Sequence, residues 1–165
     1  MNKELFLRQL KERGLKLTPQ RRAIIDALVE TRHLHPSADL VFREGKRIRA
    51  GLSLSTVYAT LNAFCRNGLI RVLEFDRMEN RYELSFEEHV NLVCRACGII
   101  LDVGVPFSFD PEAVERETGF QVLEKRLEYY GLCRDCARKK EGTKRRKNIQ
   151  TARTMKGGKV IKGRR

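Results

Sequence analysis

The chain has 165 residues, of which 41% are hydrophobic and 33% charged, with a formal net charge of +13 at pH 7. This length allows one domain or two small ones. No apolar run reaches the ~18 residues that a membrane helix needs, and residues 1–17 contain no apolar block that would make a secretory signal. We therefore expect a cytoplasmic protein without a membrane partner, whose five cysteines serve as metal ligands or free thiols.

The charge is distributed unevenly along the chain. Residues 1–74 hold 14 basic and 7 acidic side chains, residues 75–137 hold 7 and 13, and residues 138–165 hold 13 and 1. A basic half followed by an acidic half is typical of two domains with different partners. Nucleic acid is the expected partner of the basic half, and a solvated helix surface is the alternative.

Helical signals dominate the first half. Residues 3–13 predict a short helix that ends at Gly14. Thr18 and Pro19 supply an N-cap and a first-turn proline for a second helix. Its apolar residues fall on one stripe that we expect to be buried, formed by Ala23, Ile24, Ala27 and Leu28.

Two more helices follow. The third is expected to start at Pro36 and Ser37 and to end near Gly45, before a basic loop that contains Lys46, Arg47 and Arg49. Ser53 can cap a fourth helix, and Gly68 occupies the position of a C-terminal glycine. The apolar residues of this helix have helical spacing; they are Leu54, Val57, Leu61 and Phe64.

The periodicity then changes from helix to strand. Residues 69–75 and 80–84 are short and extended, and the polar residues 76–79 between them predict the turn of a hairpin. Helices followed by a two-stranded wing make a winged helix-turn-helix, in which the last helix enters the major groove of DNA.

The second half is predicted to mix strands with a helix. Strands are expected at residues 90–93 and 99–103, and a longer one over residues 120–130. Asp110 and Pro111 begin a helix that ends at Gly119. Residues 138–165 have few large apolar side chains and many charges, so we expect them to be disordered in isolation.

Four cysteines form two pairs with the spacing of zinc ligands. Cys94 and Cys97 make one pair, and Cys133 and Cys136 make the other. Two such pairs can supply the four soft donors of a closed, tetrahedral, structural Zn²⁺ site. A redox dithiol is the less favoured alternative. Cys65 stands apart in the predicted fourth helix and is expected to be a small buried hydrophobe.

These motifs, in this order, resemble the ferric uptake regulator family of metal-dependent bacterial repressors. The matching stretches are residues 17–21 (LTPQR), 35–39 (HPSAD), 54–58 (LSTVY), 68–69 (GL), His89 with the first cysteine pair and Gly98, and residues 126–131 (RLEYYG) with the second pair. The resemblance implies a winged-helix DNA-binding domain over residues 1–85, a small α/β dimerisation domain with the four-cysteine zinc site over residues 86–137, and a basic tail. It also implies homodimers that bind palindromic, A·T-rich, double-stranded DNA operators.

The resemblance implies a regulatory metal site as well. Carried over residue by residue, its ligands would be His35, Glu83, His89 and Asp102, with Asn91 where the family usually has a histidine. Imidazole and carboxylate donors suit Fe²⁺ or Mn²⁺, with Zn²⁺ as an alternative. Ordinary polar residues at a domain boundary are the other reading.

Four further positions qualify the resemblance. An additional family metal site usually takes a histidine where Glu124 and Lys125 stand, so that site is not predicted here. His33 has no matching role and is interpreted as a surface imidazole. In the recognition helix the family often places Arg or Asn after the tyrosine, where this chain has Ala59, so a bidentate base contact is lacking.

The expected DNA contacts lie on the second and fourth helices. They are Arg21, Ser55, Thr56, Tyr58 and Asn62, with Thr60 also available. A half-buried helix aromatic is the alternative reading of Tyr58. An operator that differs from the usual one of the family is expected because of Ala59.

The favoured function is a metal-responsive transcriptional repressor of metal-uptake or peroxide-stress genes. Glu83 resembles the iron sensors of the family and Asp102 the peroxide sensors, in which Fe²⁺ drives oxidation of ligand histidines, so both signals stay open. The alternative is a zinc-ribbon RNA-binding protein that uses its basic tail. An enzyme is not expected, because neither a nucleophile nor a phosphate loop accompanies His89 and Glu83, and no substrate beyond metal ions is indicated.

Overall fold

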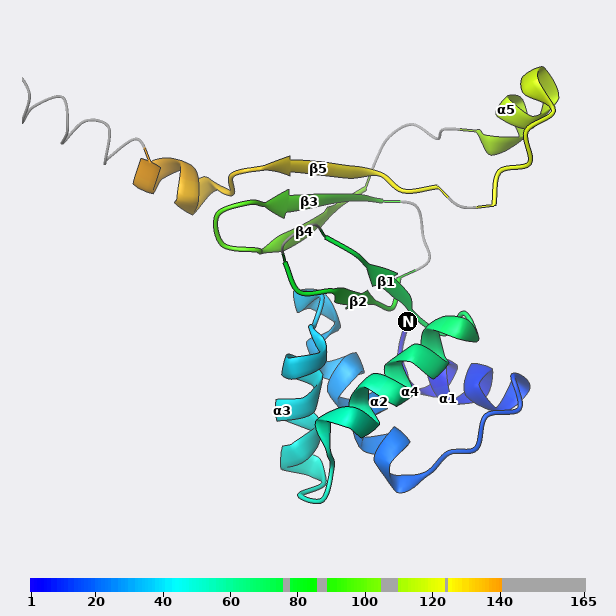
Figure 1. Cartoon of the computed structure of the whole chain (residues 1–165), viewed down its shortest axis with the longest axis vertical. Coiled ribbons are helices and arrows are strands. Elements are labelled where there is room, and N and C mark those ends of the chain that lie inside the picture. Colours follow the sequence, from blue (N-terminus) through cyan, green and yellow to red (C-terminus); the bar gives the residue numbers. More distant parts are fainter. Residues whose placement is uncertain (76–77, 86–88, 105–109, 124, 141–165) are drawn as a thin grey trace, which may run out of the picture. The chain divides into compact units, whose positions relative to one another are not determined.

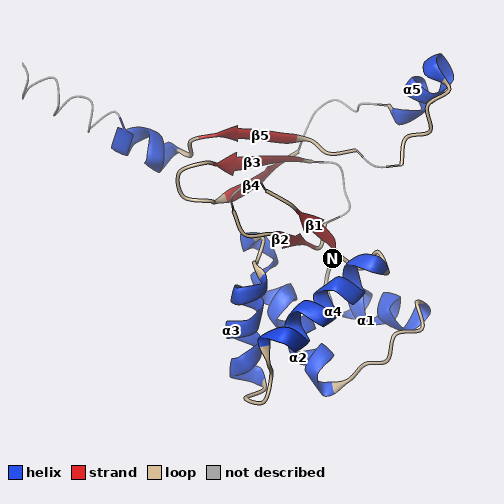
Figure 2. Ribbon diagram, in the orientation of Figure 1, coloured by secondary structure: helices blue, strands red, loops and turns tan. Residues whose placement is uncertain are grey.

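The computed structural model describes residues 1–75, 78–85, 89–104, 110–123 and 125–140 (Figure 1). The chain forms two compact units, Met1–Glu88 and His89–Arg165. Both units contain helices and strands (Figure 2), which confirms the predicted α+β class. Each helix among the described residues is too short or too polar to cross a lipid bilayer.

The first unit is mainly helical. Its helices are α1 (Lys3–Glu12), α2 (Pro19–Thr31), the 3₁₀ turn η1 (Arg32–Leu34), α3 (Ala38–Ile48) and α4 (Leu54–Arg66). Each α-helix of this unit follows a capping residue whose side chain accepts a hydrogen bond from a first-turn N–H, and these caps are Asn2, Thr18, Ser37 and Ser53. The caps satisfy donors that have no partner inside the helix. The predicted caps at Thr18 and Ser53 are therefore confirmed.

The predicted end of the third helix near Gly45 is wrong. Helix α3 continues to Ile48, so Lys46 and Arg47 belong to its last turn and not to a loop. A Cβ atom on Gly45 would stand 2.8 Å from Cδ2 of the buried Leu52. The glycine therefore provides room for Leu52, and the basic side chains suit the negative end of the helix dipole.

A two-stranded wing follows α4. Strands β1 (Arg71–Leu73) and β2 (Arg81–Glu83) are antiparallel, with Val72 opposite Tyr82. The strands are shorter than the extended segments predicted at residues 69–75 and 80–84, and Leu69, which comes before β1, is buried in the core. Residues 76–77 of the predicted turn lie outside the described residues. Gly68 has φ +62°, as expected of a helix-ending glycine.

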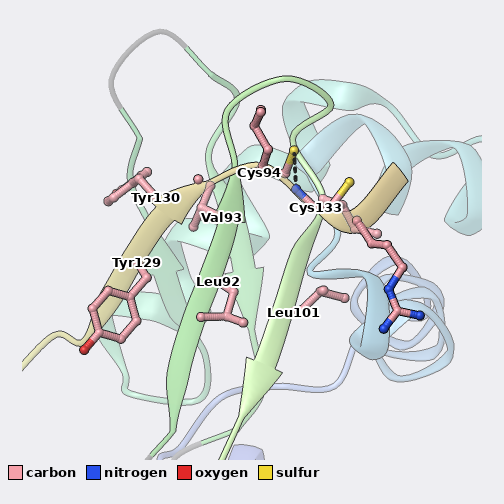
Figure 3. A pocket seen from close by; sticks show the side chains of 11 residues that line it. Leu92, Val93, Cys94, Leu101, Tyr129, Tyr130 and Cys133 are labelled. Carbon is pink, nitrogen blue, oxygen red and sulfur yellow. Dashed lines mark hydrogen bonds between the residues drawn. The ribbon is translucent and has the colours of Figure 1, made fainter. Parts of the chain in front are cut away.

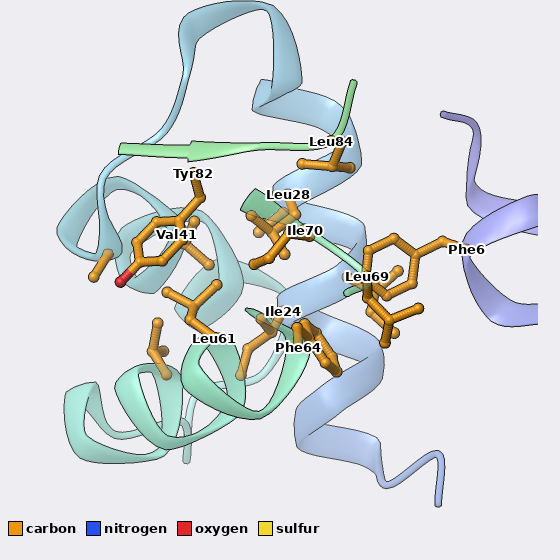
Figure 4. Close-up of a cluster of buried hydrophobic side chains, with 14 of the residues drawn as sticks. Phe6, Ile24, Leu28, Val41, Leu61, Phe64, Leu69, Ile70, Tyr82 and Leu84 are labelled. Atoms are coloured by element: carbon orange, nitrogen blue, oxygen red, sulfur yellow. The ribbon is translucent and has the colours of Figure 1, made fainter. Parts of the chain in front are cut away.

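One apolar core joins the helices to the wing (Figure 4). The rings of Phe6 and Phe64 meet edge to face, with centroids 5.2 Å apart. Ile24 and Leu61 are fully buried, and Tyr82 from β2 is 4% exposed. Each large apolar side chain buried in this way contributes about 1.5–3 kcal/mol to folding. The core holds α4 by its buried side, which leaves its other side open to solvent.

The second unit is built on a three-stranded sheet. Its central strand β3 (Val90–Cys94) pairs antiparallel with β4 (Ile100–Val103) and parallel with β5 (Glu128–Gly131). Helix α5 (Pro111–Thr118) is capped by Asp110 and ends at Gly119, which has φ +71°, as the sequence predicted.

Two expectations for the second unit are wrong. A strand over residues 120–130 is observed only from Glu128 onward, because β3 is five residues long and offers no backbone for the earlier part to pair with. Residues 134–140 are helical, so residues 138–140 do not belong to a disordered tail. The rest of the expected tail, residues 141–165, lies outside the described residues.

Candidate metal centres and nucleic-acid interface

The four paired cysteines meet at one end of the sheet in the second unit. The parallel pairing of β3 with β5 sets Cys94 beside Gly131 and so brings both cysteine pairs together. Their four Sγ atoms lie within 4.8 Å of one another, and those of Cys97 and Cys133 are 3.8 Å apart. Four sulfurs at 2.3 Å from a tetrahedral Zn²⁺ would be about 3.8 Å apart. The donor set and its spacing therefore fit structural zinc, as predicted.

Backbone hydrogen bonds prepare Cys94 for metal binding. The Cys133 N–H donates to Cys94 Sγ at 3.3 Å. This bond, with those from the N–H groups of Ala96 and Cys97, lowers the pKa of Cys94 to about 6 in spite of burial. Hydrogen bonds to the Cys133 and Cys97 side chains, together with burial, raise the pKa of Cys136 to about 12. The lowered pKa favours the thiolate form of Cys94, and a bound cation would favour deprotonation of the other three cysteines.

An apolar hollow lies beside this cluster in the second unit (Figure 3). Its volume is about 320 Å³, and its lining includes Leu92, Leu101 and Tyr129 from the three strands. Leu101 is 46% exposed and Tyr129 67% exposed, although both are large and apolar. Exposed apolar surface of this kind is typical of an interaction site.

Helix α4 presents most of the predicted DNA contacts on its exposed side. Ser55, Tyr58 and Asn62 are exposed and follow one another at spacings of three and four residues, so they share a face. Tyr58 is 48% exposed, and its environment is that of a surface aromatic rather than a core residue. Thr56 is partly exposed, whereas Thr60 is 6% exposed and is not available to DNA, contrary to expectation.

The first turn of α4 is ordered by Ser53. Its Oγ accepts from the Thr56 N–H at 3.2 Å and lies 2.8 Å from Thr56 Oγ1 and 3.0 Å from Ser55 Oγ. The cap therefore fixes the two hydroxyls that were predicted to contact DNA. Arg21 of α2 is partly exposed, and its Nη1 donates to the Lys16 carbonyl at 2.7 Å.

Sequence reasoning did not single out Arg66. This exposed residue ends α4 and lies four positions after Asn62, so it continues the same face. The spacing of four residues between Asn62 and Arg66 is the sequence pattern that could have identified it. Ala59, also exposed, stands on this side with no polar group of its own.

Two of the predicted regulatory ligands, His35 and Glu83, belong to segments of the first unit that pair through their backbones. A bridge pairs Ser37 with Arg81, and the Tyr82 N–H donates to the Pro36 carbonyl at 3.0 Å. His35 is 2% exposed and Glu83 is 4% exposed, both unusual for ionisable side chains.

The backbone of His35 is strained. Its φ is +46°, the one positive φ among the described residues other than glycine. Such conformations cost of order 1–3 kcal/mol and cluster at functional sites. The strain is therefore consistent with a functional placement of this imidazole.

The other three predicted ligands lie in the second unit. Asn91 on β3 is directly opposite Asp102 on β4, so their side chains project to the same side. His89 comes two residues before Asn91, just outside β3. Asp102 is exposed, His89 is partly buried, and Asn91 is 6% exposed.

Comparison with known proteins assigns the chain to a family. The profile of the ferric uptake regulator family matches residues 12–130, which span both units. The chain belongs to this family. A peroxide operon regulator of Bacillus subtilis is 35% identical over 134 residues, which are 81% of this chain and 92% of that protein. The peroxide-responsive repressor PerR of Staphylococcus saprophyticus is 33% identical over 128 residues, or 77% and 86% of the two chains.

Solved structures of the family have the same fold. A zinc-bound manganese uptake regulator matches with a TM-score of 0.60 and 32% identity, over 78% of this chain and 98% of that one. The peroxide stress regulator of Campylobacter jejuni gives 0.60 and 32%, over 79% and 98%. The predicted winged helix followed by a small α/β unit is thereby confirmed.

Proposed function

We propose that this protein is a metal-responsive, DNA-binding transcriptional repressor of the peroxide-sensing branch of its family. The observation that carries the proposal is the match of a regulator family across both units, with relatives at 33–35% identity named as peroxide regulators. These relatives are regulators and not enzymes. A zinc-ribbon RNA-binding protein is not favoured, because the match includes the helices of the first unit as well as the cysteine pairs.

DNA would be contacted by residues 1–85 through the exposed face of α4. Tyr58 offers a ring for a thymine methyl group or a hydroxyl for a phosphate, and Ser55 and Asn62 offer polar groups to base edges. Arg21 and Arg66 supply positive charge near the ends of their helices. The winged-helix architecture supports this assignment, since its last helix is the one that enters the major groove.

Zinc would be held by Cys94, Cys97, Cys133 and Cys136 and would tie β3 to the segment after β5. Its role there is structural, because four thiolates leave no open coordination position. We assign residues 86–137 to dimerisation, through the exposed apolar surface around Leu101 and Tyr129. A homodimer doubles the number of recognition helices, as a palindromic operator requires.

A second, regulatory ion would take His35 and Glu83 from the first unit and His89, Asn91 and Asp102 from the second. Imidazole, carboxylate and amide oxygen together suit Fe²⁺ or Mn²⁺. The buried Oδ1 of Asn91, which no donor reaches among the described residues, supports this assignment, since buried polar groups need partners. Binding of the ion would shift the chain towards the state that binds DNA.

Peroxide is the signal that we favour. His35 and His89 would hold an Fe²⁺ that activates the peroxide. Peroxide would be the oxidant and the ligand imidazoles the groups that are oxidised, with water as the reduced product. Iron or manganese sufficiency is the second signal, favoured by the glutamate at position 83.

Binding to competing nucleic acids tests the class of function. We expect the full chain, loaded with Zn²⁺ and Mn²⁺, to select A·T-rich palindromes from a random duplex pool and to prefer them to single-stranded and duplex RNA of the same sequence. Preference for RNA, or selection of no common duplex sequence, would contradict the repressor assignment.

A further inference from the structure

Asn91 has a buried polar atom that no described residue of the chain satisfies. The residue is 6% exposed, and no hydrogen-bond donor reaches its Oδ1 among the described residues. Its backbone N–H is used, since it donates to the Leu127 carbonyl at 3.0 Å. A buried acceptor without a donor destabilises the folded chain. Such an atom calls for a partner that comes from outside the chain.

The surroundings of Asn91 indicate what that partner is. Asp102 faces it from β4, and His89 comes two residues earlier, just before β3. On β5 its partner is Glu128, whose carboxylate accepts a hydrogen bond from the Tyr130 hydroxyl. Carboxylate and amide oxygens on one face, with an imidazole next to the strand in sequence, are ligand types for a divalent cation and would not attract an anion.

We propose that Asn91 sets the metal preference of the regulatory site, by binding the ion directly through Oδ1 and by shifting the site from Zn²⁺ towards Mn²⁺ and Fe²⁺. The inference rests on the regulatory site of the proposed function. It differs from that function in assigning a selective role to the one position where this chain replaces the usual histidine of the family with an amide.

The chemistry of the donor gives the direction of the shift. Imidazole nitrogen suits Zn²⁺ and other metals late in the series, whereas carbonyl oxygen suits Mn²⁺. Exchange of one imidazole for an amide oxygen keeps the site neutral at that position, so the charge of the ligand set does not change. The loss of affinity therefore falls mainly on Zn²⁺, and Mn²⁺ and Fe²⁺ gain relative to it.

Dissociation constants of two variants test the proposal. The full chain, with zinc in the cysteine cluster, is titrated with Mn²⁺ by electron paramagnetic resonance and with Zn²⁺ against a chromophoric chelator. We expect Asn91→His to tighten Zn²⁺ binding at least tenfold more than Mn²⁺ binding. It should also add an imidazole nitrogen coupling to the spin-echo modulation of the bound Mn²⁺.

The second variant separates a ligand from a structural residue. We expect Asn91→Leu to weaken Mn²⁺ binding at least tenfold, the scale of a ligand loss. Its melting temperature without the regulatory ion should be unchanged or higher, because an unsatisfied buried amide has been removed. Asn80→Leu, the same change at an exposed position of the wing, should leave both dissociation constants as they are.

Three outcomes would overturn the proposal. Wild-type Mn²⁺ affinity in Asn91→Leu shows that Asn91 is not a ligand. Equal gains for Zn²⁺ and Mn²⁺ in Asn91→His show that it is not selective. Both of these results are compatible with a regulatory metal site. A wild-type chain that binds one ion only, at the cysteines, would exclude the regulatory site and with it the role of Asn91.

Discussion

Single residues decide the metal and DNA chemistry of this protein, and the backbone around each of them prepares it. The Cys133 N–H stabilises the Cys94 thiolate, a positive φ places His35, and β-sheet register puts Asn91 opposite Asp102. Ser53 holds the hydroxyls of Ser55 and Thr56. Substitutions at such positions can therefore change function while most of the core is left intact.

Replacement of Cys94 tests the structural zinc. Serine supplies no thiolate, and a structural zinc site can contribute ~10 kcal/mol or more to folding. We expect Cys94→Ser to lose its zinc by metal analysis, to unfold the second unit and to elute as a monomer in gel filtration. Cys65→Ser, a change outside the cluster, should keep one zinc per chain. A dimeric Cys94→Ser variant with one zinc per chain would rule out this role.

Replacement of Tyr58 tests the exposed face of α4. Because the side chain is 48% exposed, we expect Tyr58→Ala to keep the fold. It should lose about 1–3 kcal/mol of specific DNA binding, the value of a base-edge contact. Fluorescence anisotropy with selected and random duplexes measures this difference. Tyr58→Phe separates the ring from the hydroxyl, and an unchanged ratio of specific to random affinity in Tyr58→Ala would count against the contact.

Secondary-structure elements differ in how far local sequence determines them. The caps Thr18, Ser53 and Asp110 and the terminal glycines Gly68 and Gly119 act within a few residues, and they were predictable. Such devices bond to their own helix end, so no tertiary information is needed. The spacing within each cysteine pair is local and was predictable too, whereas the pairing of β3 with β5 brings the two pairs together.

Elements that depend on distant partners were not predictable. A glycine at position 45 suggests the end of a helix. Its missing side chain instead leaves room for Leu52, a contact that no local sequence pattern reveals. Residues 120–127 alternate like a strand, but a strand needs a partner, and β3 pairs with residues 128–131. The candidate regulatory ligands were named from resemblance, whereas the burial of His35, Glu83 and Asn91 came from the structure.

The N-terminus of α4 offers a test at the scale of one element. We expect Ser53→Ala to lower the free energy of unfolding by about 0.5–2 kcal/mol, because the cap is removed. Ser53→Asp should restore stability, since aspartate caps well and suits the positive end of the helix. It should nevertheless weaken DNA binding, because it puts a negative charge where phosphates approach.

A matched charge change gives the control for this test. Asn2→Asp introduces the same charge at the cap of α1 and should leave DNA affinity nearly unchanged. Chemical denaturation and anisotropy report the two quantities separately. Wild-type affinity in Ser53→Asp would place the N-terminus of α4 away from DNA.

Across the whole molecule, basic and acidic side chains are concentrated in different parts of the chain. Residues 1–74 carry an excess of basic side chains, residues 75–137 carry an excess of acids, and residues 141–165 contain ten Lys and Arg against one Glu. A short basic segment of this kind neutralises phosphates without reading bases. We therefore assign affinity to the tail and sequence preference to α4.

Removal of residues 141–165 tests this division. Truncation after Lys140 keeps the described helix over residues 134–140, so we expect zinc content and operator preference to persist. Affinity for all duplexes should fall, and the log–log salt slope should become shallower by ~0.9 for each phosphate that the tail no longer neutralises. A tail of unchanged length with Gln for its ten basic residues should behave like the truncation. Identical salt slopes in the truncated and full chains would exclude a DNA role for the tail.

A second metal ion, held in part by His89, is proposed to control DNA binding. The most direct test is the affinity of the zinc-loaded chain for a selected A·T-rich palindrome, measured by anisotropy with and without Mn²⁺. We expect Mn²⁺ to raise the affinity of the wild-type chain about tenfold or more, within the usual range of coupling between two sites. His89→Ala should lose this response, and His33→Ala, at an exposed histidine outside the ligand set, should keep it. Operator binding that is equally tight without Mn²⁺, or a full Mn²⁺ response in His89→Ala, would contradict the account.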